Sequence, residues 1–151
     1  MKIAFSDFDG TLYFHDEAII PQINIEAVNK WRQQGNLFVL CSGRDVHSLM
    51  HEVNNQKLSY DFVICNNGGT IFDKNLKLIK SFPLNKIQLE KLVHSDIAKE
   101  SWHILFSSAE KMRTTINSPK SQLLKYFESE KYKNQDIIQK ISVEQALAEM
   151  N

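Results

Sequence analysis

The opening stretch of the chain decides its fold: Lys2-Ile3-Ala4-Phe5-Ser6-Asp7-Phe8-Asp9-Gly10-Thr11-Leu12. Its first part, Lys2 to Ser6, contains a short and partly aromatic apolar run, which is typical of a buried strand. The run stops at Asp7 to Thr11, a polar segment that contains a glycine. The pattern therefore predicts a strand that leads directly into a functional loop.

The same alternation of strand and helix continues after this loop. After Pro21, apolar residues recur at helical spacing as far as Gly35, a residue suited to ending a helix. A second apolar run at 37–41 predicts a strand, and an amphipathic pattern that begins near Asp45 predicts a second helix. A third short strand is predicted at 62–65.

Three strands that alternate with two helices define the expected fold class. The fold is predicted to be α/β: a Rossmann-like parallel sheet with helices on both faces and right-handed crossovers. Each strand is followed by small or polar residues, namely Asp7 to Thr11, Ser42 to Arg44, and Asn66 to Gly69. Because such sheets bind ligands beyond the carboxyl ends of their strands, these three loops are expected to converge on one site.

The alternation of parallel strands and helices stops at Thr70. A hairpin is predicted at 70–79, followed by Pro83, where we place a domain boundary. Residues 1–83 are expected to form the N-terminal portion of the α/β core, and residues 84–151 a small mixed α+β unit. In that unit the pattern predicts a helix over 84–99, strands at 102–106 and 112–116, and helices after Pro119 and after Ser142.

Composition argues against several classes of partner. The chain has 151 residues, in which 18 lysines and arginines balance 18 aspartates and glutamates, so no net field favours nucleic acid or an anionic membrane. No stretch approaches the roughly 18 to 20 apolar residues that span a bilayer. Cys41 and Cys65 each end an apolar run, as buried free thiols do, which favours a reducing, cytoplasmic setting.

Asp7 and Asp9 carry the chemistry that the first loop predicts. A carboxylate can attack phosphorus and form an acyl phosphate, so Asp7, nearest the strand, is the expected nucleophile. Asp9 is expected to protonate the leaving oxygen and later to deprotonate water. Two carboxylates that face a phosphate dianion need a cation, and such oxygen ligands favour Mg²⁺. The plainer alternative is that these aspartates only form a turn.

The other two loops supply the expected phosphate-binding groups. Ser42 and Gly43 lie at a predicted helix N-terminus, where a hydroxyl and backbone amides favour an anion, although an ordinary helix cap is the alternative. Arg44 is expected either to contact the substrate or to brace the start of the helix. Thr11 can donate a hydrogen bond to its own loop or to phosphate. Asn67 serves either the substrate or the glycine turn that follows it.

Three motifs, in this order, resemble the Cof-type branch (subfamily IIB) of the haloacid dehalogenase superfamily. They are Asp-Phe-Asp-Gly-Thr-Leu at 7–12, Ser-Gly-Arg at 42–44 and Asn-Asn-Gly-Gly at 66–69. Members of that branch remove phosphate from sugar phosphates and related small metabolites. The resemblance covers residues 1 to about 83, and it implies that the residues after them begin a cap domain.

The resemblance also implies a role for each of four residues. Asp7 would be the nucleophile and a magnesium ligand. Asp9 would be the acid and base, and it would bind magnesium through its backbone carbonyl. Ser42 would hold the transferring phosphoryl group, and Asn67 would lie near the substrate under the cap.

The chain departs from the pattern of this family in its second half. The family continues after the cap with a lysine that steadies the phosphoaspartate and with a glycine- and aspartate-rich loop that completes the magnesium site. Neither is found here, since Lys120 and Lys125 fall in an expected cap helix. The chain is therefore expected to end inside the cap, as a fragment or a shortened relative. A shortened sheet would expose an edge that a second copy or a partner chain could cover.

The function predicted first is a magnesium-dependent phosphohydrolase that acts on a small phosphorylated metabolite through an Asp7 phosphoenzyme. Without the later lysine and carboxylates, the charge of the transition state is less compensated. The alternative is therefore a non-catalytic remnant that binds phosphate or a partner chain. A phosphomutase, which uses the same nucleophile, is a further alternative.

Overall fold

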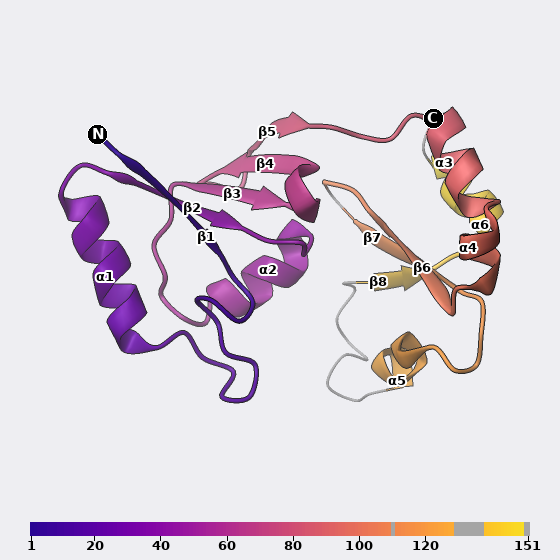
Figure 1. Ribbon diagram of the computed structural model, residues 1–151, viewed down its shortest axis with the longest axis horizontal. Helices are drawn as coiled ribbons and strands as arrows, with labels where there is room; N and C mark the ends of the chain where they lie inside the picture. The colour runs from indigo at the N-terminus through magenta and orange to yellow at the C-terminus, as the bar shows by residue number, and fades with distance from the viewer. Residues whose placement is uncertain (110, 129–137, 150–151) are drawn as a thin grey trace. The chain divides into compact units, whose positions relative to one another are not determined.

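The computed structural model describes residues 1–109, 111–128 and 138–149. The chain divides into two compact units, Met1–Phe82 and Pro83–Asn151, which are described one at a time (Figure 1). The first unit carries all of the residues that the sequence predicts for the site. Within the described residues, no helix combines the length and the apolar character needed to cross a membrane.

The first unit is built on a five-stranded sheet in the order β1-β2-β3-β4-β5. Its elements are β1 (Ile3–Asp7), α1 (Gln22–Gln33), β2 (Leu37–Cys41), α2 (Val46–Val53), β3 (Phe62–Cys65), the short 3₁₀ helix η1 (Asn66–Gly68), β4 (Thr70–Asp73) and β5 (Leu78–Ser81). Strands β1, β2 and β3 are parallel, whereas β4 and β5 are added antiparallel. The predicted α/β fold with a Rossmann-like core is confirmed, and the predicted hairpin forms β4 and β5.

The helices of the first unit pack on the sheet through one face. Both crossovers step in the same direction, from β1 to β2 and from β2 to β3, so right-handed connections put α1 and α2 on the same side. Leu40, Val63 and Phe72 are neighbours across β2, β3 and β4, and all three are buried. The sequence predicts helices on both faces of the sheet, and residues 1–82 provide the helices of one face.

Strand β1, which ends in Asp7, is an edge strand of the sheet. Ile3 and Phe5 lie on the same face of this strand, and 50% and 63% of their surface is accessible. Large apolar side chains on an unpaired edge strand are a place where another strand or chain can add. The first unit therefore has the exposed edge that the sequence predicts for a shortened sheet.

Local capping sets the start and end of the helices beside the loops. Helix α1 begins directly after Pro21, and it is followed by Gly35, whose φ of 77° is readily adopted by glycine. Helix α2 begins at Val46 because the Asp45 carboxylate accepts hydrogen bonds from the amides of residues 47 and 48. The predicted start of this helix near Asp45 is confirmed.

The second unit contains a three-stranded sheet in the order β6-β7-β8. Its elements are α3 (Lys86–Val93), α4 (Asp96–Glu100), β6 (His103–Ser107), β7 (Met112–Ile116), α5 (Gln122–Glu128), β8 (Ile138–Lys140) and α6 (Val143–Glu149). Strand β8, which is three residues long, was not predicted. Ser142 and Gln145 form the predicted capping box at the start of α6.

The single helix predicted over 84–99 is wrong, because this segment forms two helices. Helix α3 starts with a capping box between Asn85 and Gln88 and ends at Val93. Ser95 then starts α4, since its hydroxyl accepts a hydrogen bond from the Ala98 amide at 3.2 Å. Apolar residues continue at helical spacing across the break, so the cap on Ser95 is the feature that the periodicity hides.

A partly buried ion pair connects the end of α1 to the sheet. Arg32 donates to the two carboxylate oxygens of Asp61 at 2.9 and 2.7 Å, and the Phe38 amide of β2 donates to Asp61 at 2.8 Å. The hydrogen bond from Arg32 lowers the pKa of Asp61, against the opposing effect of burial. Asp61 therefore connects the first helix, the second strand and the start of the third.

Asp61→Asn is expected to destabilise the chain by about 1 to 3 kcal/mol at neutral pH, because the charge-assisted hydrogen bonds of Arg32 are lost. Folding lowers the pKa of Asp61, so its contribution is present above the unfolded value of about 3.9 and is lost as pH falls through the folded value. Urea unfolding of both proteins should show a difference at neutral pH that shrinks in acid.

Asp96→Asn is the matched control for this measurement. Asp96 pairs with Lys99 on the surface, and 92% of its side chain is accessible, so the same chemical change should leave stability nearly unaltered. If Asp61→Asn unfolds at the same urea concentration as the wild type at neutral pH, the ion pair does not stabilise the fold.

Candidate active site

The ends of β1, β2 and β3 meet at one edge of the sheet, as the parallel pairing requires. Asp7, the last residue of β1, is in register with Cys41, the last residue of β2. The amide of Ser42 donates a hydrogen bond to the Ile64 carbonyl of β3 at 2.9 Å. The Asn67 amide in turn donates to the Ser42 carbonyl at 3.3 Å. The structure thus brings the three predicted loops together.

Asp7 presents its side chain at the exposed end of β1. Its Oδ2 atom accepts a hydrogen bond from the Thr11 hydroxyl at 3.4 Å. The loop between them turns around Phe8, a fully buried residue whose carbonyl accepts hydrogen bonds from three amides of the following turn. Gly10 has a φ of 76°, so a side chain at this position would strain the turn.

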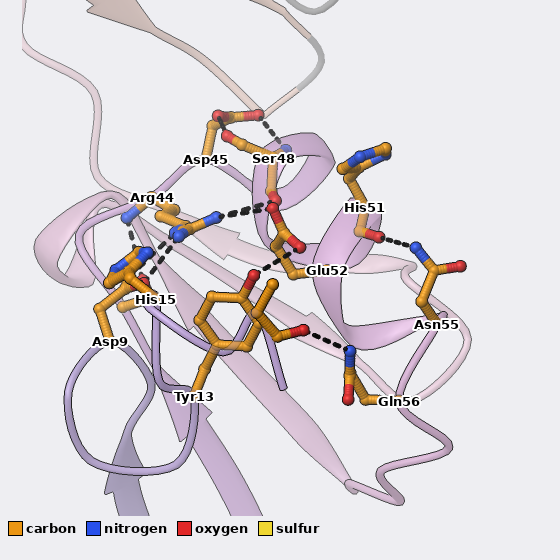
Figure 2. Close-up of polar contacts among 12 residues, drawn as sticks. Asp9, Tyr13, His15, Arg44, Asp45, Ser48, His51, Glu52, Asn55 and Gln56 are labelled. Atoms are coloured by element: carbon orange, nitrogen blue, oxygen red, sulfur yellow. Dashed lines mark hydrogen bonds and ion pairs between the residues drawn. The ribbon is translucent and has the colours of Figure 1, made fainter. Parts of the chain in front are cut away.

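Asp9 lies in a different environment from Asp7. Both of its carboxylate oxygens accept hydrogen bonds from the Arg44 guanidinium, from Nε to Oδ2 at 2.9 Å and from Nη2 to Oδ1 at 2.7 Å (Figure 2). The Nε2 atom of His15 lies 2.9 Å from Oδ1 of the same carboxylate. Asp9 is therefore held by two large side chains, whereas Asp7 contacts the small hydroxyl of Thr11.

Arg44 joins the first loop to α2. Its guanidinium carbon lies 5.6 Å from the ring centre of Phe8 and 5.9 Å from that of Tyr13, within reach of cation–π attraction. Its Nη1 atom is 3.8 Å from Oε1 of Glu52, and the Tyr13 hydroxyl donates to Glu52 at 3.0 Å (Figure 2). Burial, and then the hydrogen bond to Glu52, raise the pKa of Tyr13, which therefore remains a donor. Of the two roles expected for Arg44, these contacts match bracing of the helix start rather than contact with a substrate.

The sequence prediction did not include three members of this network, namely Tyr13, His15 and Glu52. Tyr13 and Glu52 are 39 residues apart in the chain, and no motif spacing connects them. Their contact depends on how α2 packs beside the first loop. The expected convergence of the loops at one sheet edge is the signal that could have placed the start of α2 near Asp9.

The Ser42 loop approaches η1 closely at Gly43, so a side chain at this position would require Asn67 to shift. A Cβ atom on Gly43 would lie 3.0 Å from Oδ1 of Asn67. Asn66 and Asn67 have φ angles of 54° and 53°, a conformation that asparagine tolerates better than most residues. Asn67 therefore shapes the turn and also places its side chain against the Ser42 loop.

The N-terminus of α2 is closed by its own cap. Asp45 is buried, and it accepts hydrogen bonds from the amides of His47 and Ser48 and from the Ser48 hydroxyl. A phosphate group at this edge would therefore meet the loop of Ser42 and Gly43 rather than open amides of the helix end. Of the anion-binding groups that the sequence predicts here, the loop of Ser42 and Gly43 is therefore the part that remains open to phosphate.

Some of the oxygen ligands around Asp7 are suited to a magnesium ion. Proteins commonly hold Mg²⁺ with one or two carboxylates, together with water and substrate phosphate. The Asp7 carboxylate is exposed, whereas Asp9 uses both of its oxygens on Arg44. In the described part of the chain, no three histidine, cysteine, aspartate or glutamate side chains gather as a metal site. The exposed Asp7 carboxylate is therefore the side chain of this loop best placed to hold the ion, and the Asp9 backbone carbonyl is the second ligand that the resemblance implies.

Two free thiols lie at the ends of β2 and β3, close to these loops. Burial, and then the charge of Asp7, raise the pKa of Cys41. Burial is also the main cause that raises the pKa of Cys65 to about 12. Because the thiolate is the reactive form, neither cysteine competes with Asp7 as a nucleophile at neutral pH.

Several solved structures share the fold of this chain. BT1666 from Bacteroides thetaiotaomicron, a phosphatase of the haloalkanoate superfamily, has a TM-score of 0.75 and 21% identity over 99% of this chain and 52% of its own. The subclass IIB sugar phosphatase BT4131 has a TM-score of 0.74 and 20% identity over 98% of this chain and 55% of its own. A haloacid dehalogenase-like hydrolase from B. subtilis has a TM-score of 0.75 and 20% identity over 97% of this chain and 56% of its own.

These structures are about twice as long as the chain, which spans 52% to 56% of their length. A search of curated protein sequences found no match. The family model of haloacid dehalogenase-like hydrolases matches residues 4–150, which is nearly the whole chain. The resemblance drawn from the three motifs is thereby confirmed, and the chain belongs to the haloacid dehalogenase-like hydrolases.

Proposed function

We propose that the chain is the nucleophile-bearing part of a magnesium-dependent phosphohydrolase that acts through an aspartyl phosphate on Asp7. The observation that carries the proposal is the contrast between Asp7 and Asp9. The first is exposed at the end of a parallel strand, and the second is held by Arg44 and His15. Two carboxylates in distinct environments can divide the nucleophilic and the acid–base roles.

Asp7 forms the covalent intermediate of the proposed reaction. One of its oxygens attacks phosphorus while the bond from phosphorus to the leaving oxygen breaks, and the leaving oxygen takes a proton from Asp9. In the second step water attacks the same phosphorus, Asp9 accepts a proton from that water, and the bond to Asp7 breaks. Inorganic phosphate is released, and Asp9 is again protonated for the next cycle.

Arg44 and His15 act on this reaction through Asp9. Both oxygens of Asp9 accept N–H groups of Arg44, so the oxygen that carries a proton to the leaving group must turn away from one of these donors. His15 contacts Asp9 from the solvent side, with 60% of its side chain accessible. The bidentate contact between Arg44 and Asp9 therefore matches the step in which an ionised Asp9 accepts a proton from water.

The phosphoryl group is assigned to the loops that follow β1, β2 and β3. Thr11 has a hydroxyl beside Asp7. The hydroxyl oxygen of the buried Ser42 accepts a hydrogen bond from the Arg44 amide at 3.1 Å, which leaves its proton available to a phosphate oxygen. Asn67 is exposed at this edge, which supports its placement toward the substrate. Arg44 remains a bracing residue in this proposal, because its guanidinium is already engaged by Asp9.

Magnesium is the proposed cofactor, held by the Asp7 carboxylate and the Asp9 backbone carbonyl. When bound, it would supply the positive charge that offsets repulsion between Asp7 and a phosphate dianion. A small phosphorylated metabolite is the proposed substrate, a choice supported by the sugar phosphatase BT4131 among the similar structures. The two free thiols favour a cytoplasmic setting.

A non-catalytic remnant that binds phosphate or a partner chain is the second candidate. It is favoured by the described residues, which offer no cluster of three metal-binding side chains, and by the open edge of β1. Magnesium-dependent turnover separates the two candidates. Transfer of phosphate to a sugar phosphate instead of water would indicate the phosphomutase alternative.

Asp7→Asn is expected to lower the magnesium-dependent hydrolysis of p-nitrophenyl phosphate by at least about 10³-fold, because an amide cannot attack phosphorus. Nitrophenolate release is measured with and without magnesium on identically purified proteins. Asp96→Asn makes the same chemical change on an exposed side chain of the second unit and should keep the wild-type rate. Equal rates for wild type and Asp7→Asn would overturn the enzyme proposal in favour of the binding remnant.

Arg44→Lys is expected to loosen the loop that carries Asp9, because an ammonium group cannot replace the bidentate contact of a guanidinium. Hydrogen exchange of the amides bonded to the Phe8 carbonyl should accelerate by on the order of tenfold. Arg32→Lys breaks a comparable pair with Asp61 elsewhere in the first unit, and it should leave these amides unchanged. Unaltered exchange in Arg44→Lys would mean that the pair does not hold the loop.

A further inference from the structure

The second unit contains a cavity of about 520 Å³ between the β6–β7 hairpin and α6. Its apolar lining includes Phe106, Ile141 and Ala146. The charged residues of its described lining are Lys111, Arg113 and Glu149. A volume of roughly 300 to 1,000 Å³, with apolar walls and a few placed polar groups, is typical of small-molecule sites.

Arg113 is the buried cation of this cavity. It faces Phe106 across the β6–β7 pair, and only 9% of its side chain is accessible. Its Nε atom donates to Oε2 of Glu149 at 3.2 Å, and its Nη1 atom donates to the Met112 carbonyl at 3.5 Å. Among the described residues, these contacts use two of the five N–H groups that a guanidinium presents. The arginine is therefore available for a ligand with more acceptors.

Glu149 is a weak occupant of this position. It lies at the end of α6, and 52% of its side chain is accessible, so it can turn into solvent without leaving a buried, unpaired carboxylate. One glutamate oxygen meets Arg113 through Nε, whereas a carboxylate or phosphonate can bind a guanidinium through two parallel hydrogen bonds. A ligand anion can therefore displace Glu149 at small cost.

Lys111 adds a second positive charge to the same cavity. Among the described lining residues, the charges of Lys111 and Arg113 outnumber that of Glu149. The apolar residues beside these cations would receive the body of a ligand whose charged end faces Arg113. The cavity is thus complementary to a molecule with an anionic head and a short apolar body.

We propose that this cavity is a binding site for a small organic anion with a short apolar body, whose head group replaces Glu149 on Arg113. The site is formed by residues of the second unit alone. The proposal therefore does not rest on the function proposed above for Asp7. Binding of such an anion can therefore be measured independently of phosphate hydrolysis.

The probe is phenylphosphonate, which has an anionic head, an apolar ring and no bond for a phosphatase to hydrolyse. It is titrated into the 151-residue chain and followed through backbone amide signals in ¹H–¹⁵N NMR spectra. Saturable shifts are expected at Ser107, Ser108 and Lys111. Methylphosphonate, which lacks the ring, should bind on the order of tenfold more weakly, because less apolar surface is buried. Benzylamine, with a cationic head, should not bind.

Variants of the exposed charges test the role of Glu149 without disturbing the core. Glu149→Gln is expected to tighten phenylphosphonate binding several-fold, because the competing carboxylate is removed, and Lys111→Gln is expected to weaken it several-fold. Lys120→Gln, a change of an exposed lysine outside the cavity, should leave the affinity unaltered. Arg113→Gln should abolish binding, provided that its spectrum retains the folded pattern.

The outcomes that overturn the proposal are equally definite. Shifts confined to Ser42, Gly43 and Arg44 would place the anion in the Asp7 site instead, and the same titration of Asp7→Asn identifies that case. Equal binding of benzylamine and phenylphosphonate would show an apolar crevice without anion recognition. An unchanged or weaker affinity in Glu149→Gln would show that Glu149 does not occupy the ligand position.

Discussion

The parallel pairing of β1, β2 and β3 is the constraint on which the rest of the first unit depends. Because the three strands run in the same direction, the loops that follow them must leave at one edge of the sheet. The register puts Asp7 opposite Cys41, and hydrogen bonds then carry the contact from the Ser42 loop to η1. A slip of one residue would turn Asp7 to the other face.

Arg44 connects two of the loops that meet at this edge of the sheet. Its backbone belongs to the loop after β2, and its guanidinium holds Asp9 in the loop after β1. The rings of Phe8 and Tyr13 lie beside the guanidinium, and Glu52 of α2 lies 3.8 Å from its Nη1 atom. The same contacts separate the two aspartates chemically, since Asp9 is immobilised while Asp7 remains accessible.

The second unit contains a charged pair formed by its own residues. Arg113 lies on the central strand β7, and its partner Glu149 lies at the end of the last helix. Burial of a cation beside apolar side chains needs compensation, which a half-exposed glutamate supplies only weakly. The cavity at this point of the unit therefore places a cation beside apolar walls, as the proposed anion site requires.

Local pattern in the sequence was enough to determine the elements that position the site. The apolar run before Asp7, the glycine at position 10 and the Asp45 cap are features of neighbouring residues, so they could be read without coordinates. The α/β class followed from their alternation, and the family from three motifs in order. Periodicity failed at Ser95, where a cap interrupts an otherwise continuous apolar stripe. Only the tertiary structure decided that Arg44 engages Asp9 and that Tyr13 meets Glu52, because contacts between distant residues depend on how helix and loop pack together.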